Sequence, residues 1–388
     1  MPQRLSAVKY IKNNKRRVAV LIVSLGLCFV VMYLTYFLLS STTETTRPLF
    51  LESTKKLQYI SLAGSSLGID VDNVIGEEYA AEYDRRMREV ADGLEEYSGV
   101  KNVYYAPVAY IQIVPVVGNL GTEMPLLPRE ALPALLKHAG AELTEGRMPE
   151  NPGEVVLDSA SMKNNAYKIG DYLYEDSYGK RLRIVGILDC DFYFGCGIPT
   201  EDWPWNYELV VLSDGVDDMS VLLHEEGIDA RDNYDDITDY TQGVKWLKEE
   251  VADVIGNSTK YVYTGITILL FISLTVVYVT YLRDRHNEWC LYCSIGFSRK
   301  EIYMAILREL FFTFAAALIL GGALIAVSVV VLDHVMIEPN GLRCRYFYPG
   351  TLGKILCTYT LLFGILQIPV RYALYRIRTI DAIEEDLY

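Results

Sequence analysis

VYTGITILLFISLTVVYVTYL (residues 262–282) and LFFTFAAALILGGALIAVSVVVL (residues 310–332) are long apolar runs on either side of a charged segment, RDRHNEWCLYCSIGFSRKEIYMAILRE (residues 283–309). A helix of roughly 20 residues rises about 30 Å, which is the thickness of the apolar core of a bilayer. We therefore predict that both runs cross a membrane. The segment between them is too polar to insert and is expected to stay at one membrane face as a helix.

Two more uncharged or nearly uncharged runs complete the pattern, and the four predicted spans are residues 18–39, 259–282, 310–332 and 351–370. The first run is too long for the apolar part of a signal peptide and lacks a small-x-small cleavage site, so we predict a retained span. The fold class that follows is an α-helical membrane protein with four transmembrane helices. A large extracytoplasmic α+β domain, residues 40–258, lies between spans one and two.

The distribution of Lys and Arg predicts the orientation, because positively charged flanks stay in the cytoplasm. Lys and Arg are concentrated in three flanks, residues 1–17, 283–309 and 371–388, whereas the loop 333–350 holds only Arg343 and Arg345. Both termini and the segment 283–309 are therefore predicted to be cytoplasmic. Residues 42–258 and the loop 333–350 are predicted to lie outside.

The predicted outer domain is acidic. Residues 42–258 contain 18 of the 36 Lys and Arg residues but 40 of the 50 Asp and Glu residues, a net charge of −22 against −14 for the whole chain. This charge argues against nucleic acid as a partner. A surface that is acidic for solubility alone remains the simpler interpretation.

Short β-branched and aromatic segments alternate with amphipathic stretches in this domain, as is typical of an α+β fold. The predicted strands lie in 57–64, 100–106, 108–117, 154–158, 181–188 and 208–213. Helices are predicted over 79–98 and 128–140. A third, from about 242, can run without a break into span two, with Gly256-Asn257-Ser258 as a point where it could bend. The alternative is a short linker with a separate surface helix.

Motifs for catalysis, nucleotide binding and metal binding do not occur in the sequence. There is no G-x-x-x-x-G-K-[ST] phosphate loop, so the chain is expected to bind no nucleotide and to be no enzyme. Cys290-x-x-Cys293 with His286 resembles half of a zinc site, but a second pair of ligands is missing nearby. We therefore predict no metal and no cofactor bound directly.

Cys190 and Cys196 lie in the predicted outer domain, in the sequence CDFYFGCG with glycines that allow a turn. A disulfide persists outside the cytoplasm, so we predict that these two cysteines can pair. The alternative, two free thiols near a turn, is equally compatible with the sequence.

Two stretches together resemble the MacB/FtsX-type permeases, the membrane subunits of mechanotransmission ABC transporters. The first is LTEGRMPENPGEVVLDSASMKNNAYKIGDYL (143–173), followed by RLRIVGIL (181–188). The second is YLRDRHNEWCLYCSIGFSRKEIYMAILREL (281–310), which is similar to the family's cytoplasmic coupling helix. The order of one span, an outer domain and three spans is also that of the family.

The resemblance implies that the segment 283–309 docks on a separate ATPase. The positions that match the coupling pattern are Arg283, Arg285, Glu288, Gly296, Arg299, Lys300, Ile302 and Glu309. Ile295, Ile302 and Ile306 are expected to form one apolar side of this helix. The alternative for the segment is an amphipathic connector that lies on lipid.

The implied function is that of a non-catalytic bacterial permease subunit. Its partners would be a cytoplasmic ABC ATPase dimer that carries ATP and Mg²⁺, a second permease copy or a homologous permease, and membrane lipid. Efflux or extraction of a peptide, lipoprotein or hydrophobic antibiotic suits the family. The alternative is a transmembrane regulator that controls a cell-wall hydrolase or responds to a peptide without transport.

Overall fold

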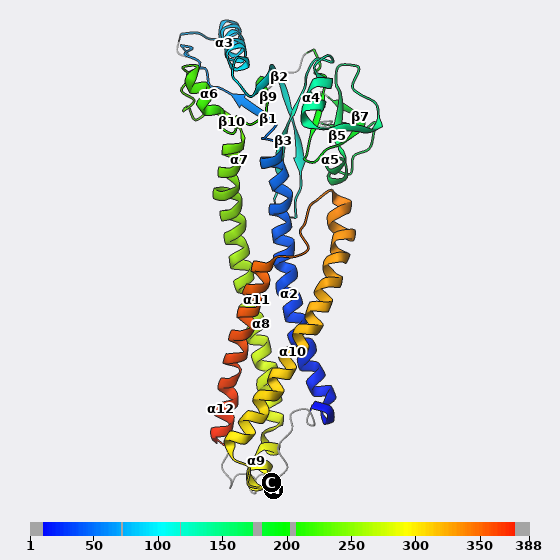
Figure 1. The fold of residues 1–388 in the computed structure, drawn as a ribbon, viewed down its shortest axis with the longest axis vertical. Coiled ribbons are helices and arrows are strands. Elements are labelled where there is room, and N and C mark those ends of the chain that lie inside the picture. Colours follow the sequence, from blue (N-terminus) through cyan, green and yellow to red (C-terminus); the bar gives the residue numbers. More distant parts are fainter. Residues whose placement is uncertain (1–10, 71–72, 117, 174–180, 202–206, 377–388) are drawn as a thin grey trace. The chain divides into compact units, whose positions relative to one another are not determined.

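The computed structural model describes residues 11–70, 73–116, 118–173, 181–201 and 207–376. The chain divides into two units, which we call the helical unit and the mixed unit (Figure 1). The helical unit comprises Met1–Leu38, Ser258–Leu332 and Arg345–Tyr388. The mixed unit comprises Leu39–Asn257 and Asp333–Cys344.

Helices build the described part of the helical unit. They are α2 (Lys15–Arg47) and α8 (Ala252–Asp284), which both continue into the mixed unit, and α9 (His286–Ser294), α10 (Arg299–Leu332), α11 (Pro349–Ile365) and α12 (Gln367–Arg376). Four helical segments are long and apolar enough to cross a membrane: Lys15–Arg47, Lys260–Asp284, Arg299–Asn340 and Pro349–Tyr375. Each overlaps one predicted span, so the prediction of four apolar helices is confirmed. Their placement in a membrane stays a prediction.

Helices α2 and α10 approach each other closely at two glycines. A Cβ atom added to Gly321 would lie 2.7 Å from the Phe29 ring and 3.1 Å from the carbonyl oxygen of Gly26. Any larger residue at 321 would therefore push the helices apart. Helix α11 joins them through Tyr359, whose ring lies 5.5 Å from that of Phe29 and whose hydroxyl donates to the carbonyl of Leu25.

The chain is helical without a gap from α7 (Tyr240–Trp246) through a π-helical turn, η2 (Leu247–Val251), into α8. This agrees with the predicted long helix, and the residues around Gly256 that the sequence offered as a break are helical. A second π-helical turn, η1 (Pro48–Glu52), follows α2.

The first sheet of the mixed unit is antiparallel, with strand order β10-β1-β9-β2-β3. Its strands are β10 (Asp236–Thr238), β1 (Leu57–Ser61), β9 (Tyr207–Ser213), β2 (Val100–Ile113) and β3 (Leu120–Pro125). Two segments that were predicted as separate strands form the single strand β2. Residues up to Pro107 pair with β9 and those from Val108 pair with β3, so the proline lies where the strand changes partner.

The second sheet has the order β4-β7-β5-β8, and β6 pairs with β7. Its strands are β4 (Glu142–Gly146), β5 (Glu154–Asp158), β6 (Tyr172–Leu173), β7 (Leu182–Asp189) and β8 (Gly195–Gly197). Among the described strands of this sheet, β5 and β7 form the only parallel pair.

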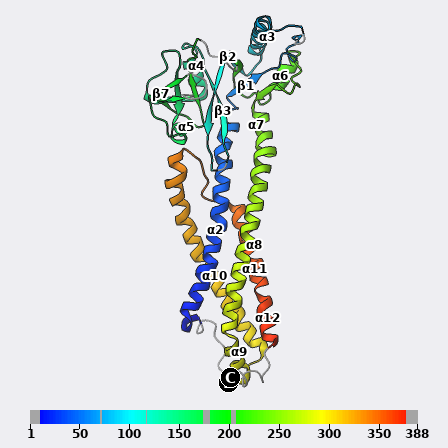
Figure 2. The same cartoon turned by 180° about the vertical axis from the view of Figure 1, so that it is seen from behind.

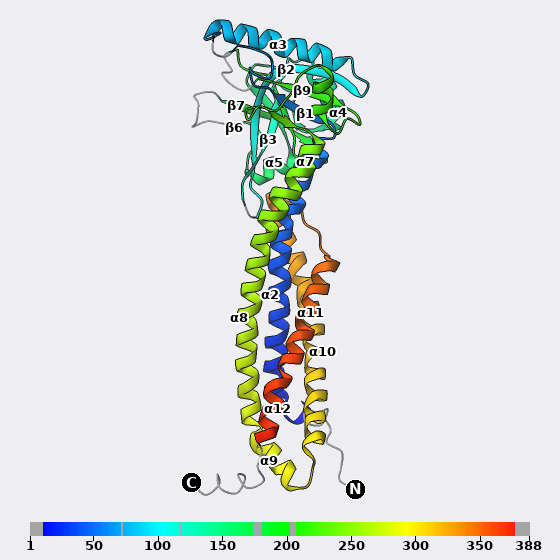
Figure 3. The same cartoon turned by 90° about the vertical axis from the view of Figure 1, so that its left-hand side faces the viewer.

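Helices of the mixed unit bury their apolar sides on these sheets. They are α3 (Glu77–Glu95), α4 (Leu132–Ala139), α5 (Ser159–Asn164) and α6 (Met219–Glu225). Met87, Val90 and Leu94 of α3 pack on strands β1, β2 and β9, and α3 lies across these strands in Figure 3. Helix α4 packs on the core shared by both sheets through Leu132 and Leu135, in the lobe that also contains β7 (Figure 2).

The turn before β5 is folded around Glu154. Its carboxylate accepts hydrogen bonds from the backbone N–H groups of Glu150 (2.9 Å) and Asn151 (3.1 Å) and from the Arg147 guanidinium. The Arg147 hydrogen bonds, together with those backbone donors, hold the pKa of Glu154 well below its usual range. The stretch GRMPENPGE thus folds as one polar unit that starts strand β5.

Two carboxyl groups lie close to one another in the first sheet. Glu208 of β9 is 7% exposed and accepts a hydrogen bond from the Tyr110 hydroxyl at 3.2 Å. Glu123 of β3 accepts one from the Thr238 hydroxyl at 3.2 Å. Burial, and secondarily the charge of Glu123, raises the pKa of Glu208 to about 7. Burial also raises the pKa of Glu123.

Candidate functional site

The predicted coupling segment 283–309 folds in three parts. Residues up to Asp284 end α8, the short helix α9 follows, and everything from Arg299 onward belongs to α10. Only residues 285–298 connect the two long helices. The polar residues 299–309 therefore form the first turns of the helix that becomes span three, because nothing in them breaks a helix.

Local sequence determines where α10 begins. The Ser298 backbone N–H donates to the Glu301 carboxylate at 2.9 Å, and the Glu301 N–H donates to the Ser298 hydroxyl oxygen at 3.3 Å. This reciprocal pair is a capping box, which satisfies backbone donors at a helix start. The Ser-x-x-Glu spacing predicts a helix start, and this signal in the sequence was missed above.

A buried ion pair joins α9 to α10. The Arg285 guanidinium lies 2.7 Å from the Glu309 carboxylate, and the two side chains are only 5% and 6% exposed. Arg285 also lies over the rings of Tyr281, at 5.5 Å, and Trp289, at 5.7 Å. Glu288 makes a second, longer contact with Arg285 at 3.4 Å. We call these five residues the Arg285 cluster.

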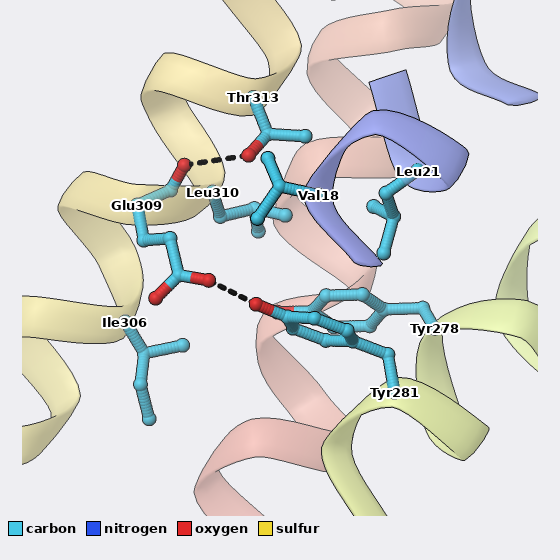
Figure 4. A pocket seen from close by; sticks show the side chains of 8 residues that line it. All are labelled: Val18, Leu21, Tyr278, Tyr281, Ile306, Glu309, Leu310 and Thr313. Atoms are coloured by element: carbon cyan, nitrogen blue, oxygen red, sulfur yellow. Dashed lines mark hydrogen bonds between the residues drawn. The ribbon is translucent and has the colours of Figure 1, made fainter. Parts of the chain in front are cut away.

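Figure 4 shows how Glu309 points from α10 toward the hydroxyl of Tyr281 on α8, which donates a hydrogen bond to it. The Thr313 hydroxyl donates to the backbone carbonyl of Glu309 at 2.9 Å. A cavity of about 10 Å³ lies here, lined by Val18, Leu21, Tyr278, Tyr281, Ile306, Glu309, Leu310 and Thr313. It has room for about one water molecule. Helices α2, α8 and α10 therefore meet around one polar point.

The structure separates the predicted site residues into two groups. Arg285, Ile302, Ile306 and Glu309 are buried. Arg283, Ile295, Gly296, Arg299 and Lys300 are exposed, and Glu288 is intermediate. The three isoleucines therefore do not form one accessible apolar side: Ile302 and Ile306 are 1% and 3% exposed, whereas Ile295 is 66% exposed.

An exposed apolar pair does lie at the end of α9. Leu291, one helical turn before Ile295, is 57% exposed, and the sequence analysis missed it because a single leucine in a polar helix carries no pattern. We call Leu291, Ile295, Gly296, Arg299 and Lys300 the docking patch. It presents two apolar side chains next to two cations.

Cys190 and Cys196 are free thiols in the structure. Burial raises the pKa of Cys196 to about 12 and also raises the pKa of Cys190. Both cysteines pack on the core of the mixed unit. A disulfide between them stays a prediction. Within the described residues, no group of three or more His, Cys, Asp and Glu side chains could hold a metal ion.

A protein-family model matches the C-terminal part of the chain. Residues 261–382 match the family model described as FtsX-like permease C-terminal. No curated protein sequence matches the chain.

Three solved structures are similar to parts of the chain. The periplasmic region of MacB from Actinobacillus actinomycetemcomitans is 13% identical, with 53% of this chain and 97% of that chain covered and a TM-score of 0.27. The extracellular domain of the noncanonic ABC-type transporter YknZ from Gram-positive bacteria is 11% identical, with 45% and 96% covered and a TM-score of 0.24. A domain of a putative permease protein from Porphyromonas gingivalis is 15% identical, with 48% and 89% covered and a TM-score of 0.22.

The family match covers α10, α11, α12, the coupling segment and most of α8, which are the elements that form the Arg285 cluster and the docking patch. The family is one of ABC transporter permeases, which are non-catalytic membrane subunits that work with a cytoplasmic ATPase. The chain is therefore a membrane protein that carries an FtsX-like permease C-terminal domain over residues 261–382.

Proposed function

We propose that the chain couples ATP hydrolysis by a separate cytoplasmic ATPase dimer to movement of its mixed unit on the outer side of the membrane. This movement would export or extract a peptide, lipoprotein or hydrophobic antibiotic. ATP and Mg²⁺ belong to the ATPase, and a second permease, identical or homologous, completes the complex. The observation that carries the proposal is a docking patch that runs from the end of α9 to the start of α10, two helices that a buried ion pair holds together.

The docking patch suits a protein partner. Leu291 and Ile295 gain free energy when a partner removes them from water, roughly 1.5–3 kcal/mol for each side chain that is fully buried. Arg299 and Lys300 beside them favour an acidic rim on the ATPase and would speed association. Exposed charges alone would give only weak contacts that salt screens.

The buried members of the predicted site have a different role in this proposal. Arg285 and Glu309 tie α9 to α10, and Ile302 and Ile306 pack the first turns of α10 into the bundle. They position the docking patch and do not touch the ATPase. A push on α9 would then move α10 and α8 together, and α8 is helical without a gap back to Tyr240.

Lipid and a second permease would cover the outward side of α8. Ile268, Leu269 and Ile272 on this helix are 55%, 67% and 59% exposed. Apolar side chains with this exposure on a span-length helix need a bilayer or another apolar helix around them.

The change Ile295→Asp tests the proposed function. We expect it to weaken binding of the chain to its ABC ATPase subunit by at least tenfold, because it removes an apolar contact and adds the cost of desolvating a carboxylate. Leu291→Asp should act in the same direction. The measurement is the dissociation constant between the purified permease in lipid nanodiscs and the ATPase.

Val221→Asp is the matched control, since Val221 is 52% exposed on α6 of the mixed unit and should not affect the ATPase. The permease alone should hydrolyse no ATP. Full ATPase affinity in the Ile295→Asp, Leu291→Asp double variant would show that the docking patch is misassigned.

The predicted orientation is tested by single introduced cysteines in a chain without its own accessible thiols. Tyr234 in the mixed unit is 85% exposed and Lys300 lies in the docking patch. In intact cells a membrane-impermeant maleimide should label Tyr234→Cys and leave Lys300→Cys unlabelled until the cells are opened. Labelling of Lys300→Cys in intact cells would reverse the orientation.

A further inference from the structure

The segment between α10 and α11 makes more specific contacts than a simple loop requires. It begins with a π-helical turn, η3 (Asp333–Ile337), and a 3-10 turn, η4 (Glu338–Asn340). We call residues 338–348 the strap. Residues 338–344 of the strap belong to the mixed unit and residues 345–348 to the helical unit.

In the mixed unit, side chains from two elements hold the backbone of the strap. The hydroxyl of Tyr193, a residue only 2% exposed, donates to the carbonyl of Gly341 at 2.8 Å. The Asn164 amide at the end of α5 donates to the carbonyl of Asn340 at 3.0 Å. The buried aromatic stretch between β7 and β8 thus has a binding partner elsewhere in the chain.

Gly341 permits this contact. Its φ of +61° favours glycine, and a Cβ atom added there would overlap the carbonyl oxygen of Ala160 and lie 3.0 Å from the Ala160 Cα. Only a residue without a side chain lets the strap lie directly on α5.

Arg343 adds two further attachments in the same unit. Its guanidinium donates to the carbonyl of Asp191. Its backbone N–H donates to the Thr45 hydroxyl oxygen at 3.1 Å, and the Thr45 hydroxyl is 3.3 Å from the carbonyl oxygen of Arg343. The strap therefore has partners on α2, α5 and the β7–β8 connection.

A second set of attachments lies in the helical unit. The Tyr33 hydroxyl on α2 donates to the carbonyl of Tyr346 at 2.9 Å and accepts from the Tyr348 N–H at 3.4 Å. The Tyr348 ring packs edge-to-face on Tyr36, with 5.6 Å between ring centroids.

The two sets of attachments are very close along the chain. Arg343 and Tyr346 are three residues apart, so the backbone between them can span at most about 10 Å. We infer that the strap is a tether: a change in the separation of the two units at this point must release one set of attachments. This inference rests on the proposed function, in which the mixed unit moves, and concerns the connection at residues 344–345, which joins the units in addition to α2, α8 and the junction of α10 with η3.

Hydrogen exchange on the full-length chain alone, in lipid nanodiscs, tests the attachment. Removing one buried hydrogen bond with Tyr193→Phe should speed exchange at the amides of Leu342 and Arg343 at least fivefold. Tyr83→Phe is the matched control, because the Tyr83 hydroxyl donates to the Leu62 carbonyl at 2.7 Å away from the strap. Strap amides that exchange as fast as an unprotected peptide in the wild-type chain, or that ignore Tyr193→Phe, would overturn the tether.

The release is tested in the complex with the ATPase. Exchange at the strap should differ at least tenfold between the nucleotide-free complex and the complex trapped with ADP and vanadate. Unchanged exchange at the strap would overturn the release. Failure of the ATPase to bind would count against the proposed function, whereas the attachment itself is decided by the experiment on the chain alone.

Discussion

Replacing Arg285 by alanine is expected to lower the free energy of unfolding of the helical unit by about 3–5 kcal/mol, because it leaves the Glu309 carboxylate buried without its counter-charge. Both side chains of the pair are nearly inaccessible, at 5% and 6% exposure. The Tyr281 hydroxyl would be the strongest remaining donor to Glu309. Thermal unfolding of the purified chain in detergent, followed by tryptophan fluorescence, measures the loss.

The double variant Arg285→Met, Glu309→Leu should recover most of this loss, because an apolar pair of similar size needs no compensation for buried charge. The cycle of the two single variants and the double variant then isolates the coupling energy of the pair. Arg283→Ala is the control, since Arg283 is exposed two residues away.

The same variants separate stability from coupling. If the ion pair positions the docking patch, Arg285→Ala should also weaken the ATPase interaction at temperatures where the chain remains folded. The stable double variant should bind the ATPase almost normally. An Arg285→Ala chain that melts like Arg283→Ala would show that the pair contributes nothing to the bundle.

The mixed unit is expected to lose stability as the pH rises, through Glu208. The pKa of this group is about 7 in the folded protein against an ordinary value of 4.5. Between these two pH values the folded protein keeps a proton on Glu208 that the unfolded chain has lost, so the contribution of Glu208 to stability is largest below pH 4.5 and falls until about pH 7. A difference of this size corresponds to about 3 kcal/mol.

Glu208→Gln should remove this slope and stabilise the mixed unit at pH 8, because the amide is always neutral. Glu123 and Asp236, whose negative charges raise the pKa of Glu208, remain in the variant, but they do not repel a neutral amide. The measurement is urea unfolding of the full-length protein at pH 5 and pH 8, with proteolysis of the mixed unit as the readout. Glu142→Gln on the exposed strand β4 is the control. Parallel pH profiles for the wild type and Glu208→Gln would contradict the prediction.

The secondary structure was largely predictable because its signals are local. A run of apolar residues as long as a bilayer is thick forms a helix in almost any context. Short β-branched and aromatic segments predicted strands where β1, β2, β5, β7 and β9 lie. Two strands were predicted on either side of Pro107, but β2 continues through it because the strand changes partner there.

The sequence predicted where the coupling segment lies in the chain, but not which of its residues are exposed. Its charges between two apolar helices showed that it cannot insert, and its spacing matched a known family. Which of its residues face outward depends on Glu309, 24 residues after Arg285, and on the packing of α2, α8 and α10 around that pair. A helical pattern alone therefore grouped Ile302 and Ile306 with the exposed Ile295.

By itself the sequence determined the four apolar helices, the acidic α+β segment between the first two and the position of the polar connector, because hydropathy, charge and period act over neighbouring residues. Tertiary structure alone decided which polar groups are buried and what they bind. The bond from Tyr193 to Gly341 joins residues 148 positions apart, and the Arg285 pair is buried only because helices far apart in the sequence pack around it. Burial is a property of elements that meet in space, and no local pattern records which elements will meet.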